Sequence, residues 1–311
     1  MKPLVSVICL CYNHERFVEK ALLSVVNQTY SNVEIIVVDD CSSDKSNELI
    51  IQFLKTYQNI KFIQNEKNVG NCTSFNKALA IANGDFIVDF ATDDVLKKDK
   101  LELQVAAFEQ LDNSYGVVFT NAEIINENGD YHKDWYARGE VVPDGYVFEK
   151  ILERSYISAS TMLVRREVFD FLGGYDERLA YEDFDFWVRS SQKFKYYYLS
   201  DKTIEKRIVS GSLSAKADTK IGYTIIASTL NVCAKAWWLL KKETEKQALK
   251  QRIYFEMRHA LMIEAFDCVL SYYSLLEEMN DTDIKSRLLK TLAELKIPLY
   301  YFYKIYKGEQ G

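Results

Sequence analysis

The sequence predicts a mainly parallel α/β sheet with helices on both faces, followed by a region that contains only helices. Two observations support this. In the first half of the chain, short apolar, β-branched runs alternate with amphipathic helical patterns, the order that builds parallel sheets. From residue 216 onward, only helical periodicity remains. We therefore expect an α/β domain over 1–215 and a helical region over 216–311.

Four apolar runs predict the parallel strands of the first half. Each run is short and almost unbroken, as expected for a strand that is covered on both faces. We place these strands at 4–11, 33–38, 60–64 and 86–91. Between them, apolar side chains at helical spacing predict helices, the third over 73–82. Asn13 is the expected N-cap of the first helix.

The pattern changes after residue 114. An apolar run predicts a strand at 115–125, and Asn128-Gly129 indicates a type I′ hairpin turn. Residues 131–158 have no regular period, so we expect an irregular, aromatic segment there. A strand, a helix and a strand should follow, at 160–165, 182–192 and 196–199.

The composition is that of a folded protein with a small acidic excess. Of the 311 residues, 48% are hydrophobic and 27% are charged, which excludes a disordered chain. The net charge of −6 argues against a dedicated nucleic-acid binder. Six unevenly spaced cysteines are too few for a disulfide scaffold, so we expect a cytoplasmic protein with reduced thiols. We expect no signal peptide, and no membrane span at 223–240, because Asn231 and Lys235 interrupt that apolar segment.

Polar residues cluster where three of the predicted strands end. The clusters are Tyr12-Asn13, Asp39-Asp40 and Thr92-Asp93-Asp94. Ligands of open α/β sheets bind at the carboxyl ends of the strands. These clusters therefore predict the ligand site.

Asp93 and Asp94 are candidates for holding a divalent cation. Adjacent carboxylates repel each other, and a cation relieves this repulsion. One or two carboxylates, completed by diphosphate oxygens, are a common way to hold Mg²⁺ or Mn²⁺. The alternative is that the pair is solvated or caps the helix that begins near Asp99. Asp39-Asp40 is likewise either turn and cap sequence or a carboxylate that binds a base or ribose.

A third acidic cluster lies in residues 173–189. Glu182 and Asp183 open the helix predicted at 182–192, where the helix dipole favours negative charge. Such a carboxylate is either a simple helix-terminal acid or a general base that deprotonates an acceptor hydroxyl.

Four segments together resemble family 2 glycosyltransferases. They are PLVSVICLCYN at 3–13, ALLSVVNQTYSNVEIIVVDDCSSD at 21–44, NVGNCTSFNKALAIANGDFIVDFATDD at 68–94 and GGYDERLAYEDFDFWVR at 173–189. No segment is specific alone, but the four occur in order at the expected spacing, and the resemblance covers about residues 1–215. It implies an inverting enzyme of the GT-A fold, with a Rossmann-like mixed sheet, that uses a nucleotide-diphosphate sugar; we expect a UDP-sugar.

The resemblance assigns nucleotide-binding residues position by position. Leu10 and Tyr12 would line the base pocket, with the Tyr12 ring packing on uracil. Asp40 would bind the base, with Asp39 as the less favoured candidate. Asn68 and Asn76 fall in a segment that lines the nucleotide pocket in the family.

The resemblance also implies the catalytic groups. Asp93 and Asp94 match the metal and ribose carboxylates, which implies Mg²⁺ or Mn²⁺ as cofactor, and Asp183 matches the catalytic base. Many members carry a further Asp two positions before Asp93, where this chain has Ala91. This departure leaves open which of Asp93 and Asp94 ligates the metal directly.

The acceptor is less well defined by the sequence. Trp135 and Tyr136, in the irregular segment, and Glu182 are candidate acceptor-binding residues. The resemblance implies transfer of a hexosyl or N-acetylhexosaminyl group to a hydroxyl of a growing cell-surface glycan or of a lipid-linked saccharide.

Other functions fit parts of the sequence less well. A sugar-nucleotide pyrophosphorylase-like nucleotidyltransferase needs a Gly-rich loop after the first strand, and a dinucleotide oxidoreductase needs G-x-G-x-x-G there. This chain has Tyr-Asn-His-Glu-Arg at 12–16 instead. A non-catalytic nucleotide-sugar-binding protein would explain Ala91 but has no use for a base at Asp183.

The helical region 216–311 should mediate association. It is rich in aromatic residues, and the run 299–303 is flanked by Lys296, Lys304 and Lys307. Aromatic rings beside lysines suit peripheral docking on the inner face of the plasma membrane. The alternative is that the aromatics close the region's own core or a homo-oligomer interface.

Overall fold

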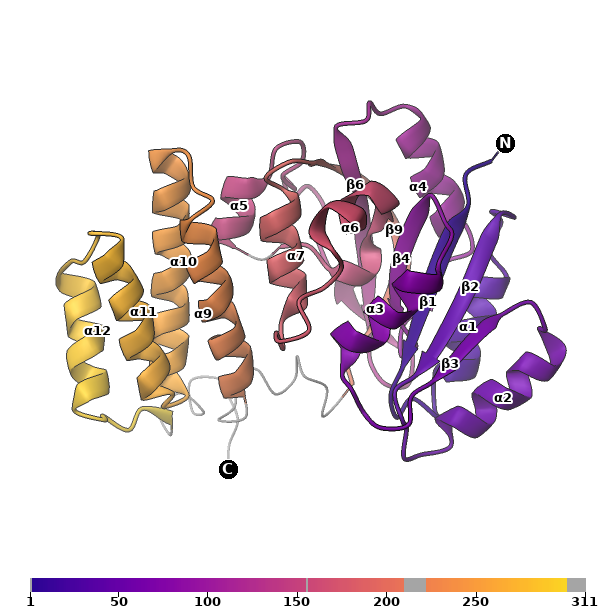
Figure 1. The fold of residues 1–311 in the computed structure, drawn as a ribbon, viewed down its shortest axis with the longest axis horizontal. Coiled ribbons are helices and arrows are strands. Elements are labelled where there is room, and N and C mark those ends of the chain that lie inside the picture. The colour runs from indigo at the N-terminus through magenta and orange to yellow at the C-terminus, as the bar shows by residue number, and fades with distance from the viewer. Residues whose placement is uncertain (1, 155, 210–221, 301–311) are drawn as a thin grey trace. The chain divides into compact units, whose positions relative to one another are not determined.

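The computed structural model describes residues 2–154, 156–209 and 222–300 (Figure 1). The chain forms two compact units that interleave along the sequence. The first comprises Met1–Val147, Ile157–Glu177 and Lys193–Val209, and the second comprises Phe148–Tyr156, Arg178–Gln192 and Ser210–Gly311. The boundary that we predict near residue 215 falls outside the described residues.

The first unit is built on a nine-stranded mixed sheet with the order β3-β2-β1-β4-β8-β6-β9-β5, to which β7 adds by pairing with β6. The parallel half holds β1 (Val5–Cys11), β2 (Val33–Asp39), β3 (Lys61–Gln64) and β4 (Phe86–Ala91). The other strands are β5 (Val95–Leu96), β6 (Tyr115–Ile125), β7 (Tyr131–Asp134), β8 (Leu163–Arg165) and β9 (Lys195–Arg207). Since β8 runs antiparallel between β4 and β6, while β6 and β9 are parallel, the predicted mixed, mainly parallel sheet is confirmed.

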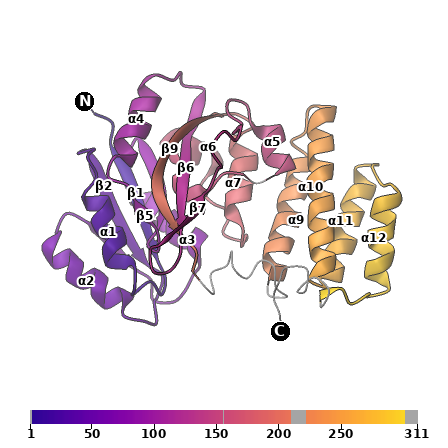
Figure 2. The same ribbon diagram turned by 180° about the vertical axis from the view of Figure 1, so that it is seen from behind.

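Helices cover both faces of this sheet (Figures 1 and 2). They are α1 (Val18–Val26), α2 (Ser46–Thr56), α3 (Asn71–Ile81), α4 (Lys100–Glu109) and α6 (Arg166–Leu172). Side chains of α1, α2 and α4 share one core with alternate residues of β1, such as Val7 and Cys9. On α3, Phe75 packs against Phe169 of α6, with ring centroids 5.2 Å apart.

Four local predictions are wrong. Asn13 does not cap α1: it has a φ of 58°, and its Oδ1 accepts a hydrogen bond from the Ser43 amide at 2.8 Å. The hairpin between β6 and β7 forms, but its loop is longer than a type I′ turn, closed by Asn126 N donating to Asp130 O at 3.0 Å. The segment 131–158 contains β7 and the helix α5 (Phe148–Glu153), and the strand expected at 160–165 is shortened to β8 by a 3₁₀ turn, η1 (Ala159–Thr161).

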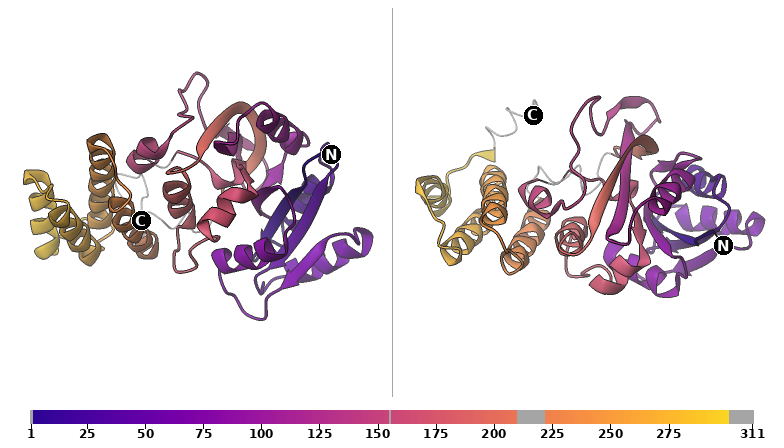
Figure 3. Two further views of the ribbon diagram at one scale, coloured as in Figure 1. Left: turned by 45° about the horizontal axis from the view of Figure 1, so that its top comes forward. Right: turned by 90° about the horizontal axis from the view of Figure 1, so that it is seen from above.

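The second unit is helical (Figure 3). Besides α5 it contains α7 (Glu182–Ser190), α9 (Tyr223–Trp237), α10 (Glu243–Met262), α11 (Phe266–Glu278) and α12 (Ile284–Glu294). Its apolar core includes Val232 of α9, Leu249 of α10 and Tyr272 of α11. In the described part of the chain, no helix has both the length and the apolar character needed to cross a bilayer.

Lys100 is a buried cation in the first unit. Its side chain is fully inaccessible, and its Nζ donates to the Thr161 carbonyl at 3.0 Å. The described residues form no ion pair with it. Burial without a counter-ion lowers the pKa of Lys100 from 10.5 to about 7.

Replacing Lys100 with Met should therefore change how stability depends on pH. The unfolded lysine keeps its proton up to about pH 10, so the penalty for burying it is full below pH 7 and fades as the pH rises. Between pH 6.5 and 9, the wild type should gain about 2–3 kcal/mol in free energy of unfolding relative to Lys100→Met. Urea unfolding at both pH values measures this difference, with the exposed Lys98→Met as the control. Parallel pH profiles for wild type and Lys100→Met would contradict it.

Candidate functional site

The three polar clusters predicted at strand ends lie at one edge of the sheet. β1 is flanked by β2 and β4, and the registers pair Cys11 with Asp39 and Leu10 with Ala91. Tyr12, Asp40 and the Asp93–Asp94 turn therefore leave the sheet side by side. This is the arrangement that the sequence predicts.

Asp39 and Asp40 both accept hydrogen bonds, but the donors belong to different loops. The fully buried Asp39 accepts from the amide and hydroxyl of Ser42, and so shapes the turn after β2. The Asp40 carboxylate accepts from Asn65 Nδ2 and from the amides of Val69 and Gly70, each at 2.9 Å. Asp40 thus fixes the loop that carries the exposed Asn68.

Asn65 and Lys77 extend this network and are absent from the sequence prediction. Asn65 Nδ2 also donates to Ser74 Oγ at 2.9 Å, and Asn65 Oδ1 accepts from Lys77 Nζ at 2.7 Å. The sequence gives no signal for them, because an asparagine in a loop and a lysine on a helix are unremarkable until Asp40 lies beside them.

Tyr12 and Leu10 occupy the positions predicted for a base pocket. Tyr12 is 46% exposed, so part of its side chain is accessible to a ligand, while Leu10 is buried. Exposed aromatic rings at a ligand edge are well suited to stack on a planar base.

His14 is a further polar group at this edge. Its Nδ1 lies 2.9 Å from Thr92 Oγ1, and the Thr92 hydroxyl donates to the Leu10 carbonyl at 3.1 Å. Burial lowers the pKa of His14, an effect that Asp93 and Asp44 oppose.

Asp93 and Asp94 face different environments. Asp94 is buried, and its carboxylate accepts from the Arg207 amide at 2.8 Å and from the Ser160 hydroxyl. This burial raises the pKa of Asp94 to about 6. Asp93 is half-buried, and no described residue donates a hydrogen bond to its carboxylate; its backbone carbonyl accepts from Arg207 Nε at 2.9 Å. Asp93 therefore has the carboxylate that is available to a cation.

The donor set fits a cation that is shared with a ligand. Across the described ranges, no group of three or more His, Cys, Asp or Glu side chains is arranged to hold a metal ion. Protein carboxylates would thus supply one or two oxygens, a number typical of Mg²⁺ or Mn²⁺ sites completed by diphosphate.

Asn76 joins α3 to the segment 173–177. Its Oδ1 accepts from the Tyr175 amide, and its Nδ2 donates to the Tyr175 carbonyl and to Glu177, all at 2.9 Å. Gly174 is required there, because its φ is 88° and an added Cβ would lie 2.5 Å from Asn76 Oδ1. Asn76 therefore holds this segment in place, a role separate from the predicted contact with nucleotide.

Asp183 lies in the first turn of α7, in the second unit. The chain entering α7 is fixed by Ser228 of α9, whose Oγ accepts from the amides of Ala180 and Tyr181 at 3.1 Å. Asp183 and Glu182 are half-buried, whereas Asp185 is buried in ion pairs with Arg189 and Lys235. The Asp185 carboxylate therefore has a structural role in this turn.

The two aromatic acceptor candidates differ in exposure. Trp135 is 38% exposed, so part of its ring can meet a ligand. Tyr136 is buried, packs edge-on against Tyr198 with ring centroids 5.3 Å apart, and pairs its backbone with the Asn121 side chain. This geometry favours a packing role for Tyr136.

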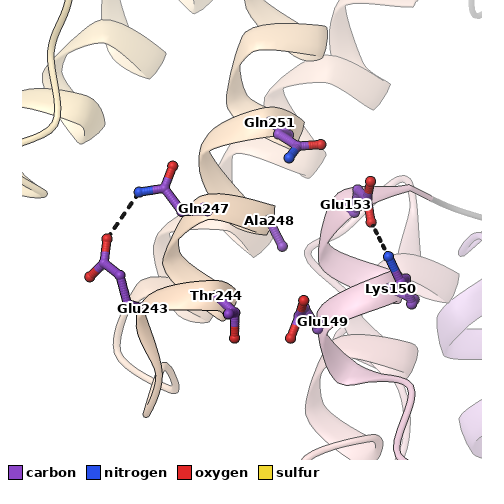
Figure 4. A pocket seen from close by; sticks show the side chains of 8 residues that line it. All are labelled: Glu149, Lys150, Glu153, Glu243, Thr244, Gln247, Ala248 and Gln251. Carbon is purple, nitrogen blue, oxygen red and sulfur yellow. Dashed lines mark hydrogen bonds and ion pairs between the residues drawn. The ribbon is translucent and has the colours of Figure 1, made fainter.

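A hollow of about 290 Å³ lies between α5 and α10 of the second unit (Figure 4). Its lining is acidic and polar and includes Glu149, Glu153 and Gln247. It contains none of the residues predicted for the site.

Two similar proteins are named as glycosyltransferases. TuaG of Bacillus subtilis, named as a teichuronic acid biosynthesis glycosyltransferase, is 29% identical over 81% of this chain and 98% of its own. The Escherichia coli protein WfgD, named as a UDP-Glc:α-D-GlcNAc-diphosphoundecaprenol β-1,3-glucosyltransferase, is 33% identical over 54% of this chain and 62% of its own.

Solved structures share the fold. TarS of S. aureus, solved in complex with UDP, aligns with a TM-score of 0.68 at 20% identity, covering 99% of this chain and 92% of that one. The mannosyltransferase PcManGT of Pyrobaculum calidifontis, in complex with GDP-Man and Mn²⁺, aligns with a TM-score of 0.60 at 18% identity, covering 99% and 84%. The family model described as glycosyl transferase family 2 matches residues 6–173. Because this family model matches the chain and the fold is that of GT-A enzymes, the chain belongs to the family 2 glycosyltransferases.

Proposed function

We propose that this glycosyltransferase transfers a sugar from a UDP-sugar to a hydroxyl of a cell-surface glycan or lipid-linked saccharide, with inversion at the anomeric carbon. The observation that carries the proposal is the convergence of the exposed Tyr12 ring, the loop held by Asp40 and the available Asp93 carboxylate at one sheet edge. The UDP complex of TarS and the lipid-diphosphate acceptor in the name of WfgD support the choice of donor and acceptor.

In this proposal the strand-end residues bind the donor. Tyr12 packs on the uracil ring beside Leu10, and Asp40 shapes the base pocket through the loop that carries Asn68. Asp93 ligates a divalent cation, which when bound neutralises charge that builds on the leaving diphosphate. The Mn²⁺ complex of PcManGT supports this cofactor.

The acceptor groups belong to α7 and to the segment after β7. Asp183 removes the proton of the attacking hydroxyl, because a general base is required when the nucleophile is a neutral alcohol. Glu182 and Trp135 contact the acceptor sugar. We place the enzyme in the cytoplasm, with residues 1–215 catalysing transfer and 216–311 serving association, at the inner face of the plasma membrane.

Nucleotide binding and donor cleavage test the proposal separately. In Mn²⁺, UDP should raise the melting temperature by several degrees more than GDP does, because in this proposal Tyr12 and the loop held by Asp40 bind uracil. Slow hydrolysis of UDP-Glc or UDP-GlcNAc, but not of GDP-Man, should follow. A larger shift with GDP would overturn the UDP assignment, and binding without cleavage or transfer would indicate a non-catalytic binding protein.

A further inference from the structure

Helix α12 leaves two of its large aliphatic side chains, and a third just after its end, exposed. Ile284 is 84% exposed, Leu288 is 58% exposed, and Leu295, which follows the helix, is 66% exposed. On the other side of the helix, Ser286 and Ala293 are almost inaccessible, and Leu289 and Leu292 are half-buried. The core of the unit therefore uses Leu289 and Leu292 and leaves Ile284 and Leu288 outside it.

The three exposed residues, which we name the α12 stripe, lie on one side of the helix. Their spacing of four and seven residues keeps the same helix face along its length. Exposed apolar side chains that align on one helix face indicate an interaction surface.

The unpaired charge beside the α12 stripe is positive. Lys285, Arg287 and Lys296 are exposed, and none of them forms an ion pair within the described part of the chain. The acids within 281–294 are engaged instead: Glu294 pairs with Lys290 at 3.6 Å, and Asp281 and Asp283 pair with Lys250. An apolar strip flanked by cations complements a surface that has an apolar interior beneath an anionic outer layer.

We propose that the α12 stripe docks on an anionic lipid bilayer, with Ile284, Leu288 and Leu295 in the acyl region and Lys285 and Arg287 at the headgroups. A single convex helix face matches a flat bilayer better than it matches a groove. A symmetric contact with a second copy would bring the unpaired cations of both chains together. This docking deepens the proposed function and rests on it. If the acceptor is a lipid-linked saccharide, docking on the bilayer brings the enzyme to the surface that holds its acceptor.

Vesicle binding by the full-length protein tests the docking without any sugar transfer. We expect the protein to sediment with vesicles of phosphatidylglycerol and phosphatidylcholine, to bind pure phosphatidylcholine at least tenfold more weakly, and to be released by high salt. Ile284→Asp/Leu288→Asp and Lys285→Glu/Arg287→Glu should each lower the partition coefficient at least tenfold.

Matched variants in the first unit control for added charge. Ile51→Asp/Val141→Asp and Lys55→Glu/Lys98→Glu make the same charge changes at exposed positions and should bind vesicles as the wild type does. Far-UV circular dichroism checks that all variants fold, and UDP affinity should be unchanged in all of them, so a failed docking proposal is distinct from a failed donor assignment. Equal binding by stripe and control variants would overturn the proposal. A dimer that Ile284→Asp/Leu288→Asp converts to a monomer, without vesicle binding by the wild type, would do so too.

Discussion

Replacing Asp183 with Asn should abolish sugar transfer while UDP-sugar affinity stays within a few-fold of wild type. The amide keeps the size of the side chain at the start of α7 but cannot take a proton, and a positioned general base contributes about 10²- to 10⁴-fold. Steady-state kcat with a fixed donor and acceptor, and calorimetric binding of UDP, give the two quantities.

Asp185→Asn is the matched control for this experiment. Asp185 lies on the same helix two residues later, but its carboxylate is buried between Arg189, at 2.6 Å, and Lys235, at 2.7 Å. Its loss should lower the melting temperature, because two cations lose their partner, and should leave kcat of the folded fraction largely intact. If Asp183→Asn keeps more than about a tenth of the wild-type rate, Asp183 is not the base.

The parallel half of the sheet could be predicted because each of its strands has a signal within its own short stretch of sequence. Each of β1, β2, β3 and β4 is a short apolar run bounded by polar residues, and the helices between them show their own period. The two residues of β5 lack such a pattern. They become a strand only because they pair with β9, a partner that is distant in sequence.

The same contrast holds for the candidate site. Strand ends at one sheet edge place Tyr12, Asp40 and Asp93 together, so their clustering follows from topology alone. The groups that differentiate the carboxylates come from elsewhere: the Arg207 amide that binds Asp94 is 113 residues away, and Asn65, which binds Asp40, is 25 residues away. Sequence spacing could therefore not decide between Asp93 and Asp94, whereas burial and hydrogen bonding favour Asp93 as the metal ligand.

Asp93→Asn should weaken Mn²⁺-dependent UDP binding at least tenfold and lower turnover by about 10²-fold. Asp94→Asn should have a much smaller effect on both. The reason is that Asp94 already accepts hydrogen bonds from the Arg207 amide and from Ser160, and an Asn oxygen can accept both of these. The low polarity that raises the pKa of Asp94 to about 6 also favours an uncharged side chain there, so this variant should fold normally.

Calorimetric titration of UDP in Mn²⁺ and again in excess EDTA measures the cation's part in binding. In EDTA, wild type and both variants should bind UDP equally weakly, because the carboxylates act on the nucleotide through the cation. In Mn²⁺, wild type and Asp94→Asn should regain affinity while Asp93→Asn does not. The reverse order would make Asp94 the direct ligand, despite its burial. Undiminished wild-type turnover in EDTA would remove the cation from the reaction and would contradict the role proposed for Asp93.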